Sequence, residues 1–296
     1  VLPTDEGHAM AEIIYDGAPS LNRIVFASGT ASGPADKADS INQLVANGVD
    51  IIADDIFWMT EPFFQDGVVA QAVDAARAAG VTYFASAGNR ARQSYEATYS
   101  DSAGFHDFDP GAGADAIQTL ASVPSGRFIQ VTLNWDEPWG AATSNFNISL
   151  VQTNGSPLPC TAPSGGQDNN PVTGLPREVV TWTNCGGGSM GVALKIQRVP
   201  GTAASPFMKY IARGNFGAFS IGEFATNSDT INPDAASANG AITVAAVSAT
   251  DPGNDTPESY SSRGPKTRLF NKDGVRLASP ETRLKPEVAA ADARGG

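Results

Sequence analysis

Apolar positions in the first hundred residues alternate between a helical period and short continuous runs. The period predicts amphipathic helices over 5–14, 35–47 and 67–79, and the runs predict buried strands over 23–27, 49–53 and 81–85. Strands that alternate with helices are typical of βαβ units built around a parallel sheet. The sequence therefore predicts an α/β unit over residues 1–100.

Beyond residue 100 the dominant period changes from 3.6 to 2. Short strands between turn-rich loops are predicted over 127–135, 146–152, 178–182, 192–197, 208–211 and 216–221. Such a series is typical of a β-sandwich. A continuous apolar run from Ala241 to Val247 then restores the α/β pattern. We therefore predict a parallel sheet flanked by helices, built from 1–100 and 225–296, with a β-sandwich inserted over 101–224.

Charge and hydropathy narrow the range of partners. The chain has 296 residues, of which 19 are Lys or Arg and 31 are Asp or Glu, giving a formal net charge of −12. This charge repels phosphate backbones and anionic lipid, so nucleic acid is not expected as a partner. No apolar run approaches the roughly 20 residues of a membrane span, so no membrane partner is expected. The chain starts at Val1 without Met or a leader, so any targeting segment is expected to have been removed or never included.

The two cysteines, Cys160 and Cys185, lie in a polar stretch rich in Gly, Pro and Asn. Their separation suits a disulfide that closes a surface loop, and two free thiols are the alternative. No other Cys or His lies nearby, so no metal site is assigned to them. Together with the turn-rich composition, the cysteine pair predicts a secreted protein.

Four stretches in fixed order resemble the subtilisin-like serine peptidases, the subtilases. They are Glu6–Ile13 followed by Gly17-Ala18-Pro19, then Asp50–Ile56, then Tyr83–Asn89, and finally Glu258–Pro265 with Lys285–Ala290. The family resemblance implies a secreted, monomeric serine endopeptidase that cleaves protein or peptide substrates through an acyl-enzyme. It also implies that the nucleophilic Ser and the first catalytic Asp lie outside this chain.

The resemblance further implies roles for individual residues. Asn89 corresponds to the side-chain amide that donates a hydrogen bond to the oxyanion. Asp54, Asp55 and Ile56 correspond to an edge strand whose backbone pairs with extended substrate. Asp55 departs from the family pattern and either biases the subsites toward basic or polar side chains or is a solvated loop acid. Ser261 and Ser262 are interpreted as structural.

The residue that acts as the general base is the sharpest question. Alignment on the base-bearing helix places Glu6 where the subtilases have His, and the related sedolisins use Glu there. Pro19 follows Glu6 by the sedolisin spacing of thirteen positions. His8 is the rival base, but on a regular helix it points ~200° away from Glu6, so both cannot face one nucleophile. A base at Glu6 predicts an acidic optimum, because an unperturbed carboxylate is a weak base at neutral pH. The third alternative is that neither residue is a base.

Calcium is the one ion considered, and no cofactor is assigned. The acidic clusters at His106, Asp107 and Asp109 and at Asp251 and Asp255 are its candidate ligands, although their spacing resembles no dedicated calcium loop.

A second class of function stays open beside the peptidase. Trp135, Trp139 and Trp182 lie in the predicted sandwich, where they either stack on a sugar or fill the core. The alternative is therefore a catalytically inactive subtilase-like protein whose β-sandwich binds protein or carbohydrate.

Overall fold

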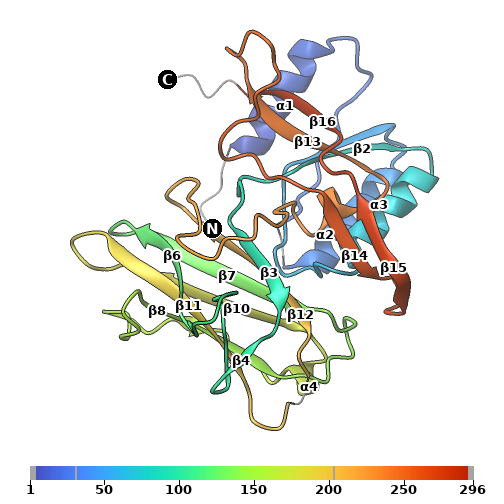
Figure 1. Ribbon diagram of the computed structural model, residues 1–296. Helices are drawn as coiled ribbons and strands as arrows, with labels where there is room; N and C mark the ends of the chain where they lie inside the picture. Colours follow the sequence, from blue (N-terminus) through green and yellow to red (C-terminus); the bar gives the residue numbers. More distant parts are fainter. Residues whose placement is uncertain (1–4, 31, 203, 293–296) are drawn as a thin grey trace.

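A four-stranded parallel sheet combines segments from both ends of the sequence. The computed structural model describes residues 5–30, 32–202 and 204–292. Its parallel strands run in the order β1 (Ile51–Asp54), β2 (Thr82–Ser86), β13 (Ala241–Ser248) and β16 (Val288–Asp292). Figure 1 shows the blue N-terminal and the red C-terminal segments together in this part of the molecule. The chain is thus a mixed α/β protein, in which residues before 87 and after 240 build one sheet.

Two helices cover one face of the parallel sheet. These are α2 (Pro34–Ala46) and α3 (Val68–Ala78). Proline suits the start of α2, because the N–H that it lacks would have no partner within the helix there. Their apolar faces form a buried cluster with β1, β2 and the segment before β13; its members include Ile41, Ile52, Val69, Val73, Tyr83 and Ile231. Within the described ranges, no helix has the length and apolarity that a membrane crossing requires.

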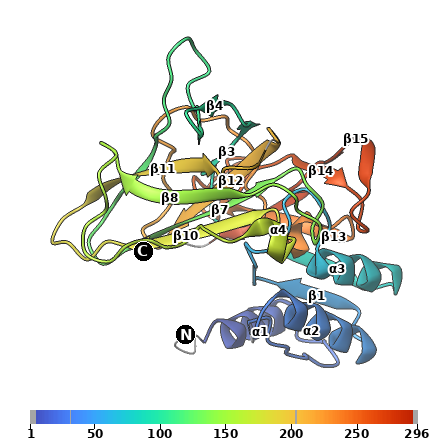
Figure 2. The same cartoon turned by 90° about the horizontal axis from the view of Figure 1, so that it is seen from below.

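The opposite face of the parallel sheet is more exposed to solvent than the face that α2 and α3 cover. Ile51 of β1 is 61% exposed, and β16 is exposed along most of its length. The first helix, α1 (Glu6–Gly17), has no buried residue. Figure 2 shows α1 and α2 on the side of the molecule away from the antiparallel sheets.

Two predicted strands do not form. Residues 23–27 pair with no strand in the described chain, and Ile24 and Phe26 stay exposed, because an apolar run becomes a strand only when a neighbour accepts its backbone hydrogen bonds. Residues 216–221 form an irregular segment in which Gly217 adopts a φ of +88°. The rings of Phe216 and Phe219 stack at 5.2 Å and pack on the neighbouring core. Their apolar pattern reflects this packing and not strand pairing.

Two antiparallel sheets built from residues 94–214 enclose the largest hydrophobic core. One sheet has the order β3 (Ser94–Thr98), β12 (Phe207–Gly214), β7 (Phe128–Trp135), β10 (Arg177–Thr183) and β9 (Ser164–Gly165). The other has the order β4 (Asp101–Ser102), β5 (Phe105–His106), β11 (Met190–Arg198) and β6 (Gln118–Val123), with β8 (Phe146–Gln152) also paired to β11. An inserted β-sandwich is our interpretation of this arrangement, and its boundaries at 101 and 224 stay predictions.

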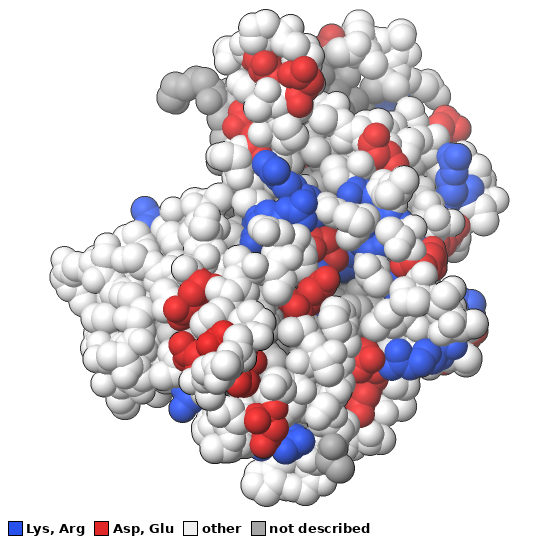
Figure 3. Space-filling view, in the orientation of Figure 1, with Lys and Arg blue, Asp and Glu red and all other residues white. Residues whose placement is uncertain are grey.

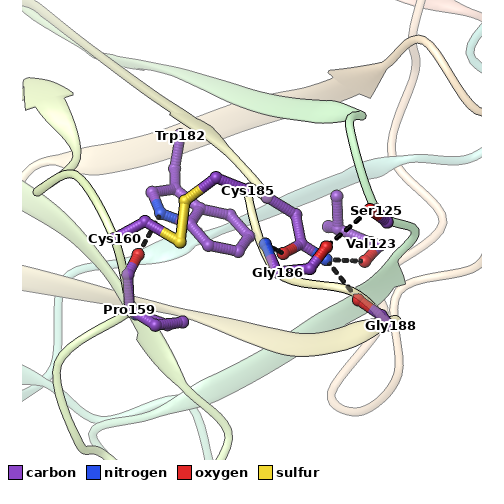
Figure 4. Close-up of a disulfide and its surroundings, with 9 residues drawn as sticks. Val123, Ser125, Pro159, Cys160, Trp182, Cys185, Gly186 and Gly188 are labelled. Atoms are coloured by element: carbon purple, nitrogen blue, oxygen red, sulfur yellow. Dashed lines mark hydrogen bonds between the residues drawn. A yellow bond between two sulfur atoms is a disulfide. The ribbon is translucent and has the colours of Figure 1, made fainter.

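The predicted disulfide between Cys160 and Cys185 is present beside this core. It links the loop that follows β8 to the loop that follows β10, and Figure 4 shows it next to the indole of Trp182, whose Nε1 donates to the Pro159 carbonyl at 3.4 Å. Trp135 and Trp182 are only 1% and 2% exposed, so they fill the core and are closed to a sugar; Trp139 is half-buried.

Buried ion pairs lie where the parallel and antiparallel parts meet. The hairpin of β14 (Lys266–Phe270) and β15 (Arg276–Arg283) carries Arg268, which lies 2.6 Å from Asp66, a residue that also pairs with Arg283. Asp229 pairs with Lys209 of β12 and lies 3.6 Å from Lys266. Buried charges persist only with partners, so the pair of Asp229 with Lys209 helps to fix how β12 of the antiparallel part is joined to the rest of the molecule.

Candidate functional site

The carboxyl ends of β1 and β2 bring two of the sequence motifs together. These strands are parallel neighbours, with Asp54 opposite Ala85. The segment after β1 therefore lies beside the loop after β2, and the Arg90 guanidinium is 4.1 Å from the centroid of the Phe57 ring. In open α/β sheets, ligands bind at this edge. The candidate site is therefore the loop from Ala87 to Arg90 with its neighbours.

The loop after β2 is held in place by two distant segments. Gly88 has a φ of +108°, and a Cβ there would lie 2.7 Å from Asn232 Oδ1 and 2.9 Å from Ser262 Oγ. Ser262 donates its backbone N–H to the Gly88 carbonyl at 2.8 Å and accepts the Arg90 N–H on Oγ at 3.2 Å. Asn232 donates its N–H to the Ala87 carbonyl at 3.0 Å. Only glycine fits at position 88, and the loop backbone is fixed.

Asn89 is the exposed residue of this fixed loop. Ala87 at the start of the loop and Arg90 at its end are buried, at 1% and 4% exposure. Ser261, also buried, accepts the Ala246 N–H on Oγ at 3.1 Å, so both serines of the Ser-Ser-Arg-Gly-Pro segment serve the backbone here. A side-chain amide on a rigid loop is the arrangement that oxyanion stabilisation requires, since the donor then needs no reorganisation during the reaction.

A buried cluster of charges lies directly behind the segment after β1. Lys37 Nζ lies 2.8 Å from Asp54 Oδ2 and 3.0 Å from Asp234 Oδ2, and it also donates to the Ile56 carbonyl. Tyr83 donates its hydroxyl to Asp54 Oδ2 at 2.8 Å. Burial opposes the charge on Lys37, but the two carboxylates outweigh it and raise the Lys37 pKa. Burial raises the pKa of Asp234, while Lys37 acts in the opposite direction. The cluster fixes the path of residues 54–58.

The segment Asp54–Ile56 differs from the expected open edge strand. β1 ends at Asp54, whose carboxylate pairs with Lys37 and accepts the Ile56 N–H at 2.9 Å. The Ile56 carbonyl accepts from Lys37. Both backbone groups of Ile56 are thus engaged within the chain and are not free to pair with an extended peptide. Asp55 is exposed.

The structure does not join Glu6 or His8 to Asn89. Both residues are exposed on α1, and no hydrogen bond or ion pair in the described ranges connects either of them to residues 86–91. The ring nitrogens of His8 lie 3.4 Å from Asp5 and 3.5 Å from Glu12, so the imidazole already faces carboxylates of its own helix.

The acidic clusters considered for calcium serve backbone turns. Asp107 Oδ1 accepts the N–H groups of Asp109 and Asp115 at 3.2 and 2.8 Å. Asp251 Oδ2 accepts those of Asp255 and Thr256. Across the described chain, no group of three or more His, Cys, Asp or Glu side chains could hold a metal ion.

His106 is a core residue and not a ligand. It is 1% exposed and lies between the Tyr95 hydroxyl, 2.9 Å from Nε2, and the Ser100 N–H, 3.1 Å from Nδ1. Burial lowers the His106 pKa to about 4, so the ring is neutral at physiological pH.

Sequence reasoning missed Lys37, Asp234, Asn232 and Arg90. Lys37 shares a helix face with the buried Ile41 at i+4, and this spacing could have shown that it points inward. No comparable signal marks Asp234 or Asn232, because their partners come from segments more than 140 positions away.

Glu61 gives the stability of this region a pH dependence. It is 4% exposed and accepts the Val69 N–H on Oε2 at 3.1 Å, at the start of α3. Burial raises its pKa to about 7, and nearby Asp234 adds to the increase. Because the folded-state pKa exceeds the unfolded value, the stability that protonated Glu61 provides is complete below about pH 4.5 and is lost as pH rises through 7.

We predict that Glu61→Gln removes this dependence. Between pH 5 and pH 8.5 the wild-type free energy of unfolding should fall relative to the variant by up to about 3 kcal/mol. Urea titrations at the two pH values measure the difference, with the exposed Glu12→Gln as the control. Parallel pH profiles for wild type and Glu61→Gln would contradict the assignment.

Comparisons with known proteins leave the chain without a family. No protein-family model matches it, and no curated protein matches it. Among solved structures, the CspB protease of Clostridium perfringens is similar with a TM-score of 0.46 and 10% identity, over 88% of this chain and 53% of that chain. The chain thus spans about half the length of that protease. The acidic stable capsid of Helicobacter pylori bacteriophage KHP30 has a TM-score of 0.23 and 17% identity, over 41% of this chain and 85% of that chain. Similarity at these levels assigns no activity.

Proposed function

We propose that the chain is part of a secreted, subtilase-like serine endopeptidase, with Asn89 as the oxyanion donor. The observation that carries the proposal is the exposed Asn89 on a loop whose backbone is fixed by Ser262 and Asn232. The loop and the segment that supports it are two of the four stretches with family resemblance, and the contact between Arg90 and Ser262 spans 172 positions of the sequence. Their contact brings the proposed oxyanion donor and its supporting segment into one site, which supports the proposal.

The second part of the proposal is the identity of the base. Glu6 lies in the first turn of α1 with its side chain exposed, so it is accessible to a nucleophile supplied from outside this chain. His8 faces Asp5 and Glu12 and is therefore the weaker candidate. In the proposed reaction the base removes the proton of a Ser hydroxyl, the Ser oxygen attacks the peptide carbonyl, and the amide of Asn89 donates to the oxygen that becomes negative.

The test uses the full protein of which this chain is expected to be a part. Casein hydrolysis is measured from pH 3 to pH 9, and the reactive Ser is detected with a fluorophosphonate probe. The expected result is labelling and hydrolysis with an acidic optimum, both lost in Glu6→Gln and retained in His8→Ala. Loss of labelling and hydrolysis in His8→Ala, with both retained in Glu6→Gln, would identify His8 as the base. Absence of labelling and hydrolysis at every pH would overturn the peptidase proposal.

A further inference from the structure

Four arginines surround the Asn89 loop without an ionic partner. They are Arg90, the last residue of the loop, Arg92, two positions further on, Arg213 near the end of β12, and Arg263 in the segment that supports the loop. In the described part of the chain, none of the four has a carboxylate within 4.0 Å of its guanidinium, whereas most other buried basic residues do. In a chain with a net charge of −12, this gathering of unpaired cations requires an explanation.

Arg90 and Arg213 share one aromatic ring. Their guanidinium groups lie 4.1 and 5.7 Å from the centroid of Phe57, in the segment after β1. Burial lowers the Arg90 pKa to about 9, and the nearby positive charge of Arg213 adds to the decrease. Arg90 is buried and donates to Asn232, while Arg213 is half-buried and donates Nε–H to Gln130 at 2.7 Å. Arg213 thus keeps its remaining donors available.

Arg92 and Arg263 form a second pair of cations on the other side of the loop. Arg92 donates to the Asn227 carbonyl at 2.6 Å, and burial together with the charge of Arg263 lowers its pKa. Arg263 is exposed, and its backbone exchanges hydrogen bonds with Thr230, which in turn donates to the Ala91 carbonyl. The position of Arg263 beside the loop is therefore fixed by backbone contacts, while its guanidinium faces solvent.

Two buried acidic residues that act electrostatically on these arginines already have basic partners. Asp234 acts electrostatically on Arg90, but it pairs with Lys37 at 3.0 Å. Asp229 acts on Arg92, but it pairs with Lys209 and lies 3.6 Å from Lys266. Neither of these two carboxylates is therefore free to form an ion pair with Arg90 or Arg92.

The cluster joins the two parts of the molecule. β12 is tied to the end of the loop by a hydrogen bond from the Ala212 N–H to the Gln93 carbonyl at 2.8 Å. Figure 3 shows Lys and Arg side chains gathered near the centre of one face, where the parallel-sheet part meets the antiparallel sheets. The antiparallel part thus contributes Arg213 to the candidate site, whose other residues follow strands of the parallel sheet.

We propose that Arg213 and Arg263, supported by Arg90 and Arg92, bind carboxylate side chains of acidic peptides beside Asn89. The inference rests on the proposed function, because it names the substrate class of the same site. A planar guanidinium binds a carboxylate through two parallel hydrogen bonds, and each such pair is stronger where water is partly excluded, as at the half-buried Arg213. Nucleic acid is disfavoured as the anion, since the net charge of −12 repels a polyphosphate at longer range.

The experiment measures binding first, so that it does not depend on catalysis. Fluorescence anisotropy is recorded for the 296-residue chain with a fluorescein-labelled peptide of consecutive glutamates and with the matching glutamine peptide. We expect the glutamate peptide to bind at least tenfold more tightly, and Arg213→Gln and Arg263→Gln each to weaken it about tenfold. Arg77→Gln is the matched control: this exposed arginine lies at the end of α3 that precedes β2, at the opposite edge of the sheet, and should change nothing.

The outcomes separate this inference from the proposed function. Equal affinity for the two peptides, or equal weakening by Arg77→Gln, overturns the acidic specificity. If Arg213→Gln unfolds the chain by circular dichroism, the exposed Arg263→Gln decides the result alone. In the full protein, preferred hydrolysis of glutamate-containing substrates supports both conclusions. Hydrolysis without preference for acidic peptides overturns the specificity alone. Selective binding by a protein that hydrolyses nothing supports the binding site and overturns the peptidase.

Discussion

Replacement of Lys37 by methionine is expected to lower the free energy of unfolding by about 3–5 kcal/mol. Methionine keeps the aliphatic stem but removes the ammonium, leaving the carboxylates of Asp54 and Asp234 buried without their cation. Lys37 is 2% and Asp234 is 1% exposed, so water cannot take the place of the lost partner. Chemical denaturation at pH 7 measures the loss, and the surface variant Lys272→Met should change stability by less than about 0.5 kcal/mol, since Lys272 is well exposed.

A second variant distinguishes lost charge from lost packing. In the triple variant Lys37→Met, Asp54→Asn and Asp234→Asn, no unpaired charge remains, and most of the lost stability should return. Asparagine still offers an oxygen to the N–H groups of Ile56 and Trp58, which Asp54 and Asp234 accept at 2.9 Å. A single variant as stable as wild type, or a triple variant no more stable than the single one, would contradict the role of the cluster.

Replacement of Asn89 by alanine is expected to lower kcat of the full protein by about 10²- to 10³-fold. The amide is proposed to donate only when negative charge develops on the substrate oxygen, so its loss should leave KM nearly unchanged. The fold should also be unaffected, because Asn89 is exposed and the loop is held through the backbone of its neighbours. Steady-state kinetics on a peptide substrate, together with thermal unfolding, measure the two quantities.

The control for Asn89→Ala is another exposed asparagine, Asn22, which lies in a turn after α1. Asn22→Ala should keep kcat within twofold of wild type. A decrease in activity of Asn89→Ala that follows a decrease in melting temperature would show a structural role instead. Full activity in a folded Asn89→Ala would remove Asn89 from the chemistry.

The pattern of apolar positions correctly predicted the helices and strands that pack an apolar face into the core. The runs at 49–53, 81–85 and 241–247 become β1, β2 and β13, and the helical period gives α2 and α3 to within about one residue. The same reasoning failed at 23–27, because strand formation also needs a neighbouring strand, which the apolar pattern does not report. It also predicted that the backbone of Ile56 is free to pair with substrate, whereas the Ile56 carbonyl accepts a hydrogen bond from Lys37 of α2. The sequence around Ile56 could not show this donor, because it comes from another element.

The sequence by itself therefore determined the alternation of helices and strands, the change to short antiparallel strands after residue 100, and the position of Asn89 directly after a buried strand. Those features follow from side-chain periodicity and turn chemistry, which act over a few residues. The tertiary structure alone decided that Lys37 meets Asp234 at a separation of 197 positions, and that Arg213 of the antiparallel sheet lies over the ring of Phe57 after β1. Charges interact through space and not along the chain, so their partners are settled only when strand order and packing bring distant segments together.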